Sequence, residues 1–363
     1  MSTEIKVLMV GPDRGVHGGI SAIVNELYAA GLDHEVELKY IGTMKEGSKL
    51  KKLLVAAFAY AHFCRKLKWC DVVHVHFSSD SSFMRKSLFI KRARKAGKKV
   101  VLHQHGGDFK TYYGQQLDKK GRDYVAGILA MGDVMLVLTE GWKEFFGQIT
   151  DPDKIVVFPN GIRVSKYLNE QKNVTKKEDI NVSSKDFNEV LFLGRICKDK
   201  GIDELIEAMK EIHSSNSNAH LFVGGIYEDN SYRQKIEDNS DFITYLGWVT
   251  GEEKDKYLDQ CGILVLPSYY EGFPVSIIEA MLRGNAVVAS AVGGIPEIID
   301  DGKDGILIPP KDSKALQKGI EKLMNDREYA SSIGILGRKK VIEKYSVEEN
   351  IKRLIQIYSK ILG

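Results

Sequence analysis

Residues 270–297 read Tyr-Glu-Gly-Phe-Pro-Val-Ser-Ile-Ile-Glu-Ala-Met-Leu-Arg-Gly-Asn-Ala-Val-Val-Ala-Ser-Ala-Val-Gly-Gly-Ile-Pro-Glu. A turn leads into a helix that is predicted to start at Ser276, and an apolar run at 286–290 predicts a strand after it. Ser276 and Glu279 stand at capping-box spacing, which places the backbone N–H groups of residues 275–278 at a helix N-terminus. Because such an end carries free donors and the positive end of the helix dipole, it attracts phosphate.

Two carboxylates in this segment, Glu271 and Glu279, are eight residues apart. Ionised carboxylates accept hydrogen bonds from hydroxyl groups, so acids beside an anion site suit the sugar or ribose of a phosphorylated ligand. The spacing alone favours a plainer interpretation, in which Glu279 only caps a helix and Glu271 is an ordinary loop acid. A second helix start is predicted where Gly293-Gly294 precedes Ile295.

The residues around the two acids change that interpretation. Gly-Phe-Pro follows Glu271, Ala-Met follows Glu279, and Gly-Gly-Ile-Pro-Glu closes the segment at 293–297. Together they resemble the E-x7-E signature of the retaining glycosyltransferases of family four, whose two domains form the GT-B fold. The resemblance implies that Glu279 binds the ribose hydroxyls of a nucleotide-diphosphate sugar and that Glu271 contacts the transferred sugar. It assigns further donor contacts to Gly272, Phe273, Val275 and Ser276.

A second group of candidates follows the predicted strand at 189–193, in Gly194-Arg-Ile-Cys-Lys-Asp-Lys-Gly201. Two cations at the end of a strand suit a diphosphate, since arginine offers a fork of donors and lysine a point charge. The element resembles the family's G-R-x-x-x-x-K-G motif. The resemblance makes Arg195 and Lys200 both donor-binding and catalytic, because they neutralise the leaving diphosphate, and it implies no divalent metal.

The loop at residues 11–21 contains Gly18-Gly19-Ile20 between a predicted strand and a predicted helix. It does not form the G-x-G-x-x-G fingerprint of dinucleotide-binding domains. Glycines at such a junction let the backbone approach a ligand closely. The loop resembles the family's Gly-Gly-Ile loop, which lies over the diphosphate and the acceptor, so Gly18 and Gly19 are expected to contact the donor. A simple strand-to-helix turn is the alternative.

Two histidine pairs end apolar runs, His74-Val-His76 and His103-Gln-His105. Side chains two residues apart in a strand point to the same face. Four histidines suggest a metal, but no third kind of ligand with suitable spacing accompanies them, so no metal site is predicted. His74 and His76 are interpreted as structural residues whose hydrogen bonds are satisfied. His105-Gly106 resembles the family's H-G element, whose histidine reaches the donor sugar and is catalytic, with His103 as the alternative match.

Strands and helices alternate throughout the chain. Strands are predicted at 5–10, 36–41, 72–77, 99–103, 134–138 and 155–158, and then at 189–193, 219–223, 243–246, 262–266, 286–289 and 305–308. This rhythm predicts an α/β fold with two doubly wound, parallel-sheet domains of the Rossmann type that face a cleft.

A chain of 363 residues usually forms two domains. We expect an acceptor-binding domain at 1–165, a nucleotide-sugar-binding domain at 166–345, and a last helix at 346–363 that packs back on the first domain. The stretch 166–188 is rich in Asn, Lys, Ser and Thr, which predicts a linker and a surface loop.

The composition narrows the class of protein. Hydrophobic residues make up 43% of the chain, as in ordinary globular proteins. The four cysteines lack metal-ligand spacing and fit a reducing compartment. No signal-peptide pattern precedes the first predicted strand, and no apolar run is long enough to span a bilayer. A cytoplasmic protein is therefore expected.

Positive charge is concentrated in residues 45–99, which contain 15 Lys and Arg residues and only three acidic residues. Apolar residues occur among these charges at helical spacing, a pattern that suits an anionic membrane surface. The alternative is a pair of ordinary amphipathic helices whose basic faces are solvated.

These observations combine into one expected function. We expect a retaining, metal-independent hexosyltransferase that moves a sugar from a UDP- or GDP-sugar to a lipid-linked saccharide, in the assembly of a bacterial surface polysaccharide. It would work at the inner face of the cell membrane, with no other cofactor and no nucleic-acid partner. The alternatives are a soluble GT-B enzyme with a small-molecule or glucan acceptor and a non-catalytic nucleotide-sugar-binding subunit.

Overall fold

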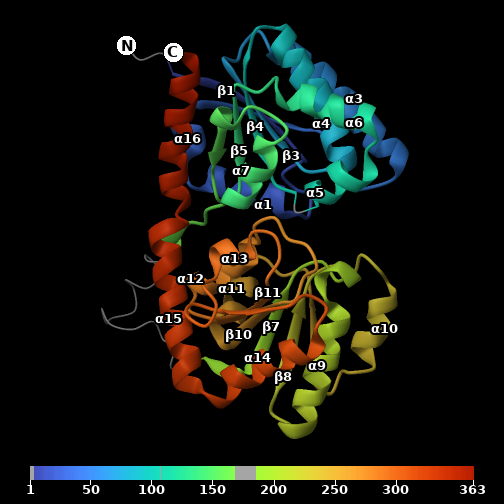
Figure 1. Cartoon of the computed structure of the whole chain (residues 1–363), viewed down its shortest axis with the longest axis vertical. Coiled ribbons are helices and arrows are strands. Elements are labelled where there is room, and N and C mark those ends of the chain that lie inside the picture. The colour runs from blue at the N-terminus through green and yellow to red at the C-terminus, as the bar shows by residue number, and fades with distance from the viewer. Residues whose placement is uncertain (1–3, 107, 168–184) are drawn as a thin grey trace. The chain divides into compact units, whose positions relative to one another are not determined.

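The computed structural model describes residues 4–106, 108–167 and 185–363. The chain divides into two compact units (Figure 1). One consists of Met1–Arg163 together with Ser346–Gly363, and the other of Val164–Tyr345. Most of the predicted linker at 166–188 lies outside the described residues.

The first unit is built on a six-stranded sheet with the strand order β2-β1-β3-β4-β5-β6, in which every pairing is parallel. The strands are β1 (Lys6–Gly11), β2 (Glu37–Gly42), β3 (Val72–Phe77), β4 (Lys99–Gln104), β5 (Val134–Val137) and β6 (Ile155–Val157). All six residues of β3 are buried. A strand that is covered on both faces needs such a continuous run rather than an alternation of apolar and polar residues.

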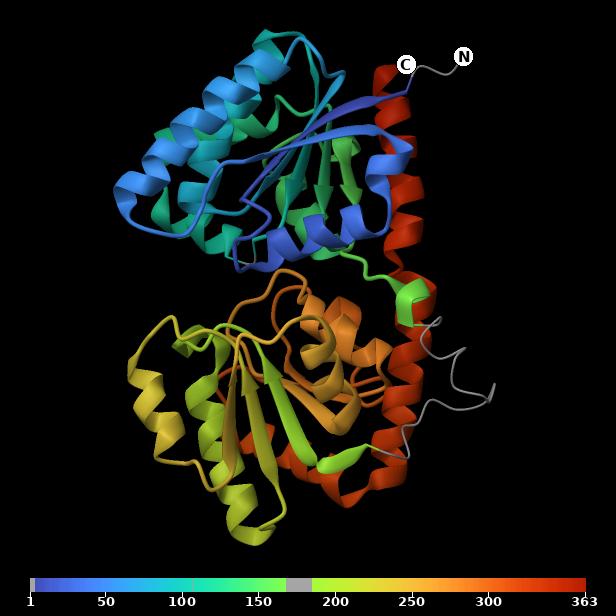
Figure 2. The same ribbon diagram turned by 180° about the vertical axis from the view of Figure 1, so that it is seen from behind.

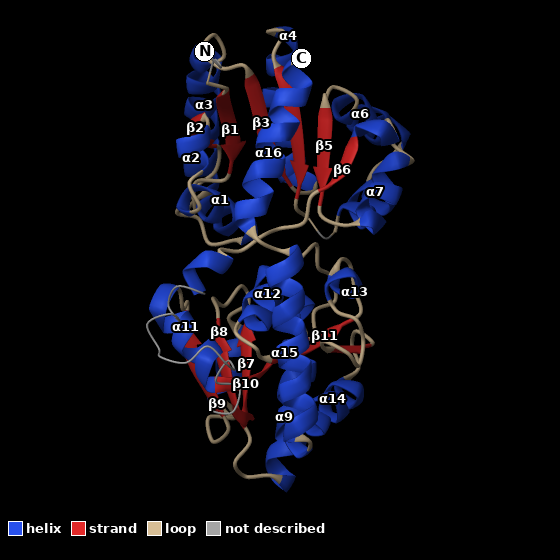
Figure 3. Cartoon of the chain, turned by 90° about the vertical axis from the view of Figure 1, so that its left-hand side faces the viewer, coloured by secondary structure: helices blue, strands red, loops and turns tan. Residues whose placement is uncertain are grey.

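The helices of the first unit cover both faces of its sheet (Figures 1 and 3). They are α1 (Gly19–Ala29), α2 (Leu32–Glu35), α3 (Lys49–Lys66), α4 (Asp80–Lys95), α5 (Phe109–Thr111), the π-helix η1 (Tyr112–Gln116), α6 (Lys119–Leu129), α7 (Glu140–Gly147), the 3-10 helix η2 (Pro152–Lys154) and α16 (Val347–Leu362). The last helix, α16, lies along this sheet in both views (Figures 1 and 2). Its Leu354 and Tyr358 are fully buried in one core with Val7, Met9 and Val72.

The second unit holds another six-stranded parallel sheet, with the order β12-β11-β10-β7-β8-β9. Its strands are β7 (Asp186–Leu193), β8 (His220–Gly224), β9 (Ile243–Gly247), β10 (Cys261–Leu266), β11 (Ala286–Ser290) and β12 (Ile306–Ile308). Its helices include η4 (Lys198–Lys200), α9 (Ile202–Ser215), α10 (Ser231–Glu237), α11 (Gly251–Gln260), α12 (Val275–Leu282), α13 (Ile295–Ile298), α14 (Ser313–Asn325) and α15 (Arg327–Lys344).

The predicted fold class, α/β with two doubly wound parallel sheets, is confirmed. The arrangement has one consequence for function. Because neighbouring parallel strands run in the same direction, the loops that follow β7, β8 and β10 leave the second sheet at the same edge. Within the described residues, no helix is both long enough and apolar enough to span a membrane.

Candidate functional site

Lys200 and Glu271 are brought together at the strand ends of the second unit. Lys200 follows β7 and Glu271 follows β10, and these two strands are direct neighbours. Lys200 Nζ lies 2.5 Å from Glu271 Oε1, and the side chains are only 15% and 10% exposed. The Ser268 hydroxyl donates to the same carboxylate oxygen at 2.7 Å. The acid is therefore held in one orientation by two donors, and an ion pair with so little solvent around it is costly to break.

Glycines on two loops permit this arrangement. Gly201 has φ of +70°, and a Cβ there would lie 2.1 Å from the carbonyl oxygen of Pro267. Gly293 has φ of +55°, and a Cβ there would lie 1.7 Å from the carbonyl oxygen of Glu271. Only glycine fits both the left-handed backbone and the close approach. The glycines of both sequence motifs thus hold the backbone around Lys200 and Glu271 in place.

The predicted capping box at Ser276 and Glu279 is wrong. The helix α12 begins one residue earlier, at Val275, and Pro274 occupies the N-cap position with an extended backbone. Proline can take that place because its missing N–H is not needed there. In the described structure no side chain caps this helix. The N–H groups of its first turn are consequently left without the capping bond that the sequence predicted, as an anion site requires.

Glu279 forms an ion pair instead of a capping bond. Lys254 of α11 donates to Glu279 Oε1 at 2.6 Å, and both side chains are 25% exposed. The carboxylate therefore stands on the first turns of α12 as part of an ion pair between two helices. A partly exposed pair of this kind can exchange one partner for a ligand hydroxyl at modest cost.

Arg195 lies in the loop after β7 and pairs with Glu228, which follows β8. Arg195 Nη1 is 2.5 Å from Glu228 Oε2, and both side chains are about half exposed. Exposed pairs of this kind contribute only about 0–1 kcal/mol, so the guanidinium remains available to an anion. A Cβ at Gly225 would lie 1.7 Å from the carbonyl oxygen of Gly194, which explains why the loop after β8 carries glycine where it meets the loop after β7.

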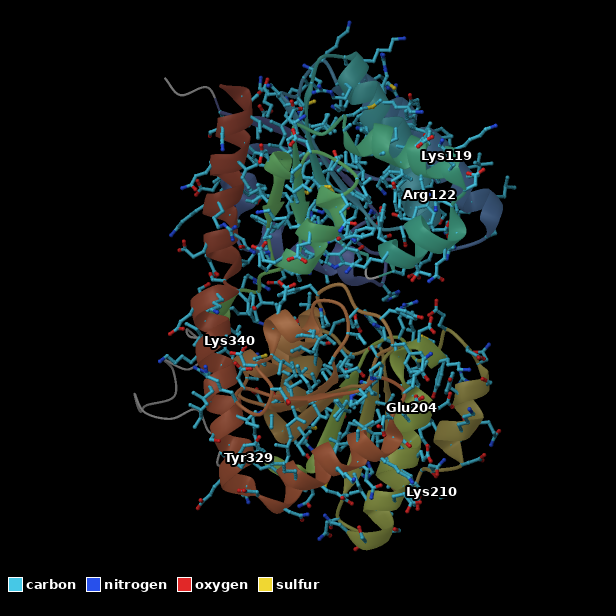
Figure 4. The ribbon with its side chains drawn as sticks, in the orientation of Figure 1. Lys119, Arg122, Glu204, Lys210, Tyr329 and Lys340 are labelled. Carbon is cyan, nitrogen blue, oxygen red and sulfur yellow. The ribbon has the colours of Figure 1, made fainter. Side chains whose placement is uncertain are left out.

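Several residues of this region carry no sequence signal that singled them out. They are Ser268 and Lys254, which hold the two acids, Glu228, which holds Arg195, and Tyr269, whose hydroxyl donates to Glu204 at 2.6 Å. Glu204 lies on α9, where its side chain is labelled together with Lys210 (Figure 4). Except for Ser268, which lies three residues from Glu271, their contacts join parts of the chain that are distant in sequence, and such contacts leave no local pattern.

In the first unit, Gly18 and Gly19 form the start of α1. Gly18 is the N-cap with an extended backbone, and its residue type adds no side-chain cap. A Cβ on either glycine would meet no atom of the described chain within 4 Å. Packing inside the protein therefore gives no reason for glycine at these two positions. Glycine at these positions would let a ligand reach the N-terminal end of α1.

The four histidines form one cluster on β3 and β4 and the residue after β4, and His74, His76 and His103 are buried. His76 lies opposite His103 in the register of the two strands. His105 Nε2 is 2.9 Å from His76 Nδ1, and His74 Nε2 is 3.2 Å from His103 Nδ1. Burial lowers the pKa of His74 and of His105 to about 3, and that of His76 well below its ordinary value. All are therefore neutral at physiological pH.

The interpretation of His74 and His76 as structural residues whose ring nitrogens all have hydrogen-bond partners holds for His74 but not for His76. His74 has partners at both ring nitrogens, since the Tyr358 hydroxyl lies 2.6 Å from its Nδ1. His76 Nε2 is buried and has no partner among the described residues. The strand pattern predicts which face a side chain takes but not which groups it meets there.

Comparison with protein families gives two matches that together span most of the chain. Residues 173–340 match glycosyl transferases group 1, and residues 26–166 match glycosyltransferase family 4.

The chain is similar to several curated glycosyltransferases. It is 32% identical to an uncharacterized glycosyltransferase of Methanocaldococcus jannaschii, over 58% of this chain and 55% of that protein. It is 26% identical to the amylovoran biosynthesis glycosyltransferase AmsK of Erwinia amylovora, over 88% of this chain and 78% of the relative. It is 30% identical to the N,N'-diacetylbacillosaminyl-diphospho-undecaprenol alpha-1,3-N-acetylgalactosaminyltransferase of Campylobacter jejuni, over 58% and 55% of the two chains. The chain thus spans about half the length of the first and last of these.

Solved structures share the fold over the whole chain. The sucrose-phosphate synthase of Thermosynechococcus elongatus superposes with a TM-score of 0.79 at 20% identity, covering 99% of each chain. Anabaena HepE in complex with UDP-glucose gives a TM-score of 0.75 at 15% identity, covering 98% of this chain and 100% of that one. At these identities the likeness establishes the fold, which is GT-B.

Proposed function

This chain belongs to glycosyltransferase family four, and from that premise we propose that it transfers a sugar from a nucleotide-diphosphate sugar with retention of configuration at the anomeric carbon. One observation carries the proposal. Lys200, Glu271 and the first turn of α12, which has no side-chain cap, gather at one edge of the second sheet. This edge offers a cation, hydrogen-bond donors and a carboxylate to one ligand, which matches a sugar attached to a diphosphate.

The donor is a nucleoside diphosphate sugar, with UDP as the first candidate. Anabaena HepE, which shares the fold, has been solved with UDP-glucose. In this chain, Lys200, Arg195 and the N–H groups at the start of α12 would stabilise the negative charge of the leaving diphosphate. Glu279 would accept from the ribose hydroxyls and Glu271 from the sugar. These groups supply positive charge without a divalent metal at the diphosphate.

The transfer would take place on one face of the sugar. The bond from the anomeric carbon to the diphosphate oxygen breaks, and the bond to the acceptor oxygen forms on the same face. The proton of the acceptor hydroxyl goes to an oxygen of the departing diphosphate. Lys200 and Arg195 serve this step by holding the diphosphate in place while its charge develops.

For the acceptor we propose a lipid-linked saccharide of a surface polysaccharide. The Campylobacter jejuni relative is named for an acceptor on diphospho-undecaprenol, and the Erwinia amylovora relative for amylovoran biosynthesis. In this chain the first turns of α3 expose large apolar side chains, with Leu50 and Leu53 67% exposed and Phe58 75% exposed. Lys51 and Lys52 of the same helix are also exposed.

This surface differs from that of an ordinary amphipathic helix. An ordinary surface helix buries its apolar residues and exposes its charges. On α3 apolar and basic residues are exposed together, and on α4 Leu88 is 54% exposed. Exposed apolar side chains among basic ones fit the interface of an anionic membrane. One residue of the basic stretch does not belong to this surface, because Lys86 is buried and its amine donates to the Thr43 hydroxyl at 2.6 Å.

A panel of nucleotide sugars tests the donor. The protein is screened by thermal shift against UDP, GDP and their sugars, and each donor that binds is assayed for transfer and for hydrolysis. Proton NMR of the product gives the anomeric configuration. Stabilisation by one nucleotide family together with a retained product supports the proposal. If a donor binds but is neither transferred to any acceptor nor hydrolysed, the protein is instead a nucleotide-sugar-binding subunit. A product with inverted configuration at the anomeric carbon would contradict retention.

A further inference from the structure

Three buried histidines in the first unit are close enough to share one ligand. A ring nitrogen from each of His74, His76 and His103 lies within 4.8 Å of those of the other two. Two of them stand on β3 and the third on the adjacent strand β4. None of the three side chains is more than 1% exposed. The strand register alone therefore gathers three imidazoles at one point of the interior.

The spacing of two of these nitrogens suits a bound ion. His74 Nε2 and His103 Nδ1 are 3.2 Å apart. Two nitrogens that bind one zinc ion tetrahedrally, at about 2.0–2.1 Å each, lie roughly 3.3 Å from one another. The pair thus has the separation that either a shared proton or a shared metal requires, and a ring nitrogen of His76 lies within 4.8 Å of a ring nitrogen of each.

Hydrogen bonding leaves part of the cluster unexplained. His76 Nε2 is buried, and in the described parts of the chain it has no hydrogen-bond partner. His103 Nε2 also lacks one, but His103 would bind the ion through Nδ1. A buried polar atom without a partner costs about 1–3 kcal/mol. We propose that His74, His76 and His103 bind a divalent transition-metal ion, with zinc as the best fit. Zinc accepts imidazole nitrogens and tetrahedral geometry, whereas magnesium and calcium need oxygen ligands.

Two neighbours supply the support that metal-binding histidines need. The Tyr358 hydroxyl lies 2.6 Å from His74 Nδ1, and His105 Nε2 lies 2.9 Å from His76 Nδ1. Such partners on the second ring nitrogen fix the orientation of the ligand. Since Tyr358 belongs to α16, the ion would connect β3 and β4 to the last helix of the chain. It would also set the position of His105 through His76, without touching the donor.

Metal content tests the proposal. Full-length protein without an affinity tag is stripped of metal by prolonged chelation, incubated with excess zinc chloride, desalted and analysed by mass spectrometry of the metal. We expect about one zinc ion per chain, and a loss of at least tenfold in His76→Gln and in His103→Gln. Tyr358→Phe should weaken zinc binding by about tenfold, because it removes only the support of His74.

A matched control separates this site from adventitious binding. His220→Gln changes a histidine of the second unit that contacts Thr244, and it should retain the full zinc content. Zinc that stays in both glutamine variants, or wild type that takes up none, overturns the proposal. Should the variants fail to fold, cobalt titration of the wild type decides instead. Bound Co²⁺ in a nitrogen-rich tetrahedral site gives intense visible absorption, and its absence overturns the proposal.

Discussion

The Lys200 amine lies 2.5 Å from a carboxylate oxygen of Glu271, and little of either side chain is exposed. The two residues are 71 positions apart in the chain and meet because they follow adjacent strands. Each is therefore both a candidate donor-binding group and the charge partner of the other. Removing one partner leaves an unpaired charge in a poorly solvated place, which costs about 3 kcal/mol or more.

A double-mutant cycle separates the two roles of this pair. Lys200→Met should lower kcat by about 100-fold, in the range observed when a hydrogen-bond donor to the transition state is lost. Glu271→Gln should lower kcat as well, and each change should destabilise the fold. The double variant has no unpaired charge, so it should regain much of the stability but none of the activity. Urea unfolding and initial rates measure the two effects. If activity returned together with stability, the pair would have only a structural role.

Glu279 provides a test in which stability changes little. Glu279→Ala should raise the donor KM about tenfold, because a hydrogen bond to a charged group contributes about 1.5–3 kcal/mol. No capping bond is lost, and the partly exposed ion pair with Lys254 contributes at most about 1 kcal/mol, so the melting temperature should change little. The matched control is Lys254→Met, which removes the other half of the ion pair and should leave donor binding largely intact. If the two substitutions changed KM equally, the Lys254–Glu279 ion pair would serve only to hold α11 against α12.

Arg195 and Glu228 distinguish donor binding from a surface ion pair. Arg195→Ala should raise the donor KM or lower kcat, since the guanidinium neutralises the leaving diphosphate. Glu228→Ala breaks the same ion pair but leaves the cation, so the rate should stay the same or rise. Addition of Mg²⁺ or Mn²⁺ should not change the wild-type rate. An absolute requirement for either ion would contradict the role given to Arg195 and Lys200.

Much of the fold follows from short-range patterns. Each observed strand contains or overlaps an apolar run that the sequence shows, because a strand buried on both faces needs continuous apolar residues. Helix starts were harder to predict. Ser276 and Glu279 have capping-box spacing, yet Pro274 is the N-cap residue and the Glu279 carboxylate pairs with Lys254. Local spacing permits a cap, but a tertiary ion pair competes for the same side chain.

The candidate site also contains residues that the sequence predicts and residues that only the structure reveals. Glu271, Lys200 and Arg195 stand in recognisable motifs, because the backbone at strand ends requires glycines that make a pattern. Glu228 stands in no such pattern, and only the adjacency of β7 with β8 reveals it. Ser268 lies three residues before Glu271 in the same loop, but no motif marks it as a partner of that acid. The histidine cluster shows a further limit. The sequence places each pair on one face, but the sheet order is needed to bring the pairs together.

Lys86 predicts an unusual dependence of stability on pH. Burial, with Arg85 nearby, lowers its pKa from an ordinary value of 10.5 to about 7. Between these values the unfolded chain holds a proton that the folded chain has lost, so the Lys86 contribution to stability rises with pH in this range. Lys86→Met should therefore raise the urea midpoint most at pH 6, and the gain should shrink by pH 10. Lys51→Met on exposed α3 is the control and should show no such trend. A gain independent of pH would contradict a buried cation.

Membrane attachment through α3 can be tested by liposome flotation. Wild type should float with anionic vesicles at low salt and not with neutral ones, because each Lys or Arg near an anionic surface contributes about 1 kcal/mol and salt screens this attraction. Lys51→Glu with Lys52→Glu should reduce flotation through charge. Leu53→Ser with Phe58→Ser should reduce it at unchanged charge, because both side chains are more than half exposed and have no core to stabilise. All these variants should keep wild-type transfer to a water-soluble acceptor analogue. Wild type that stays in solution at low salt would exclude this surface as a membrane anchor and would favour a soluble acceptor.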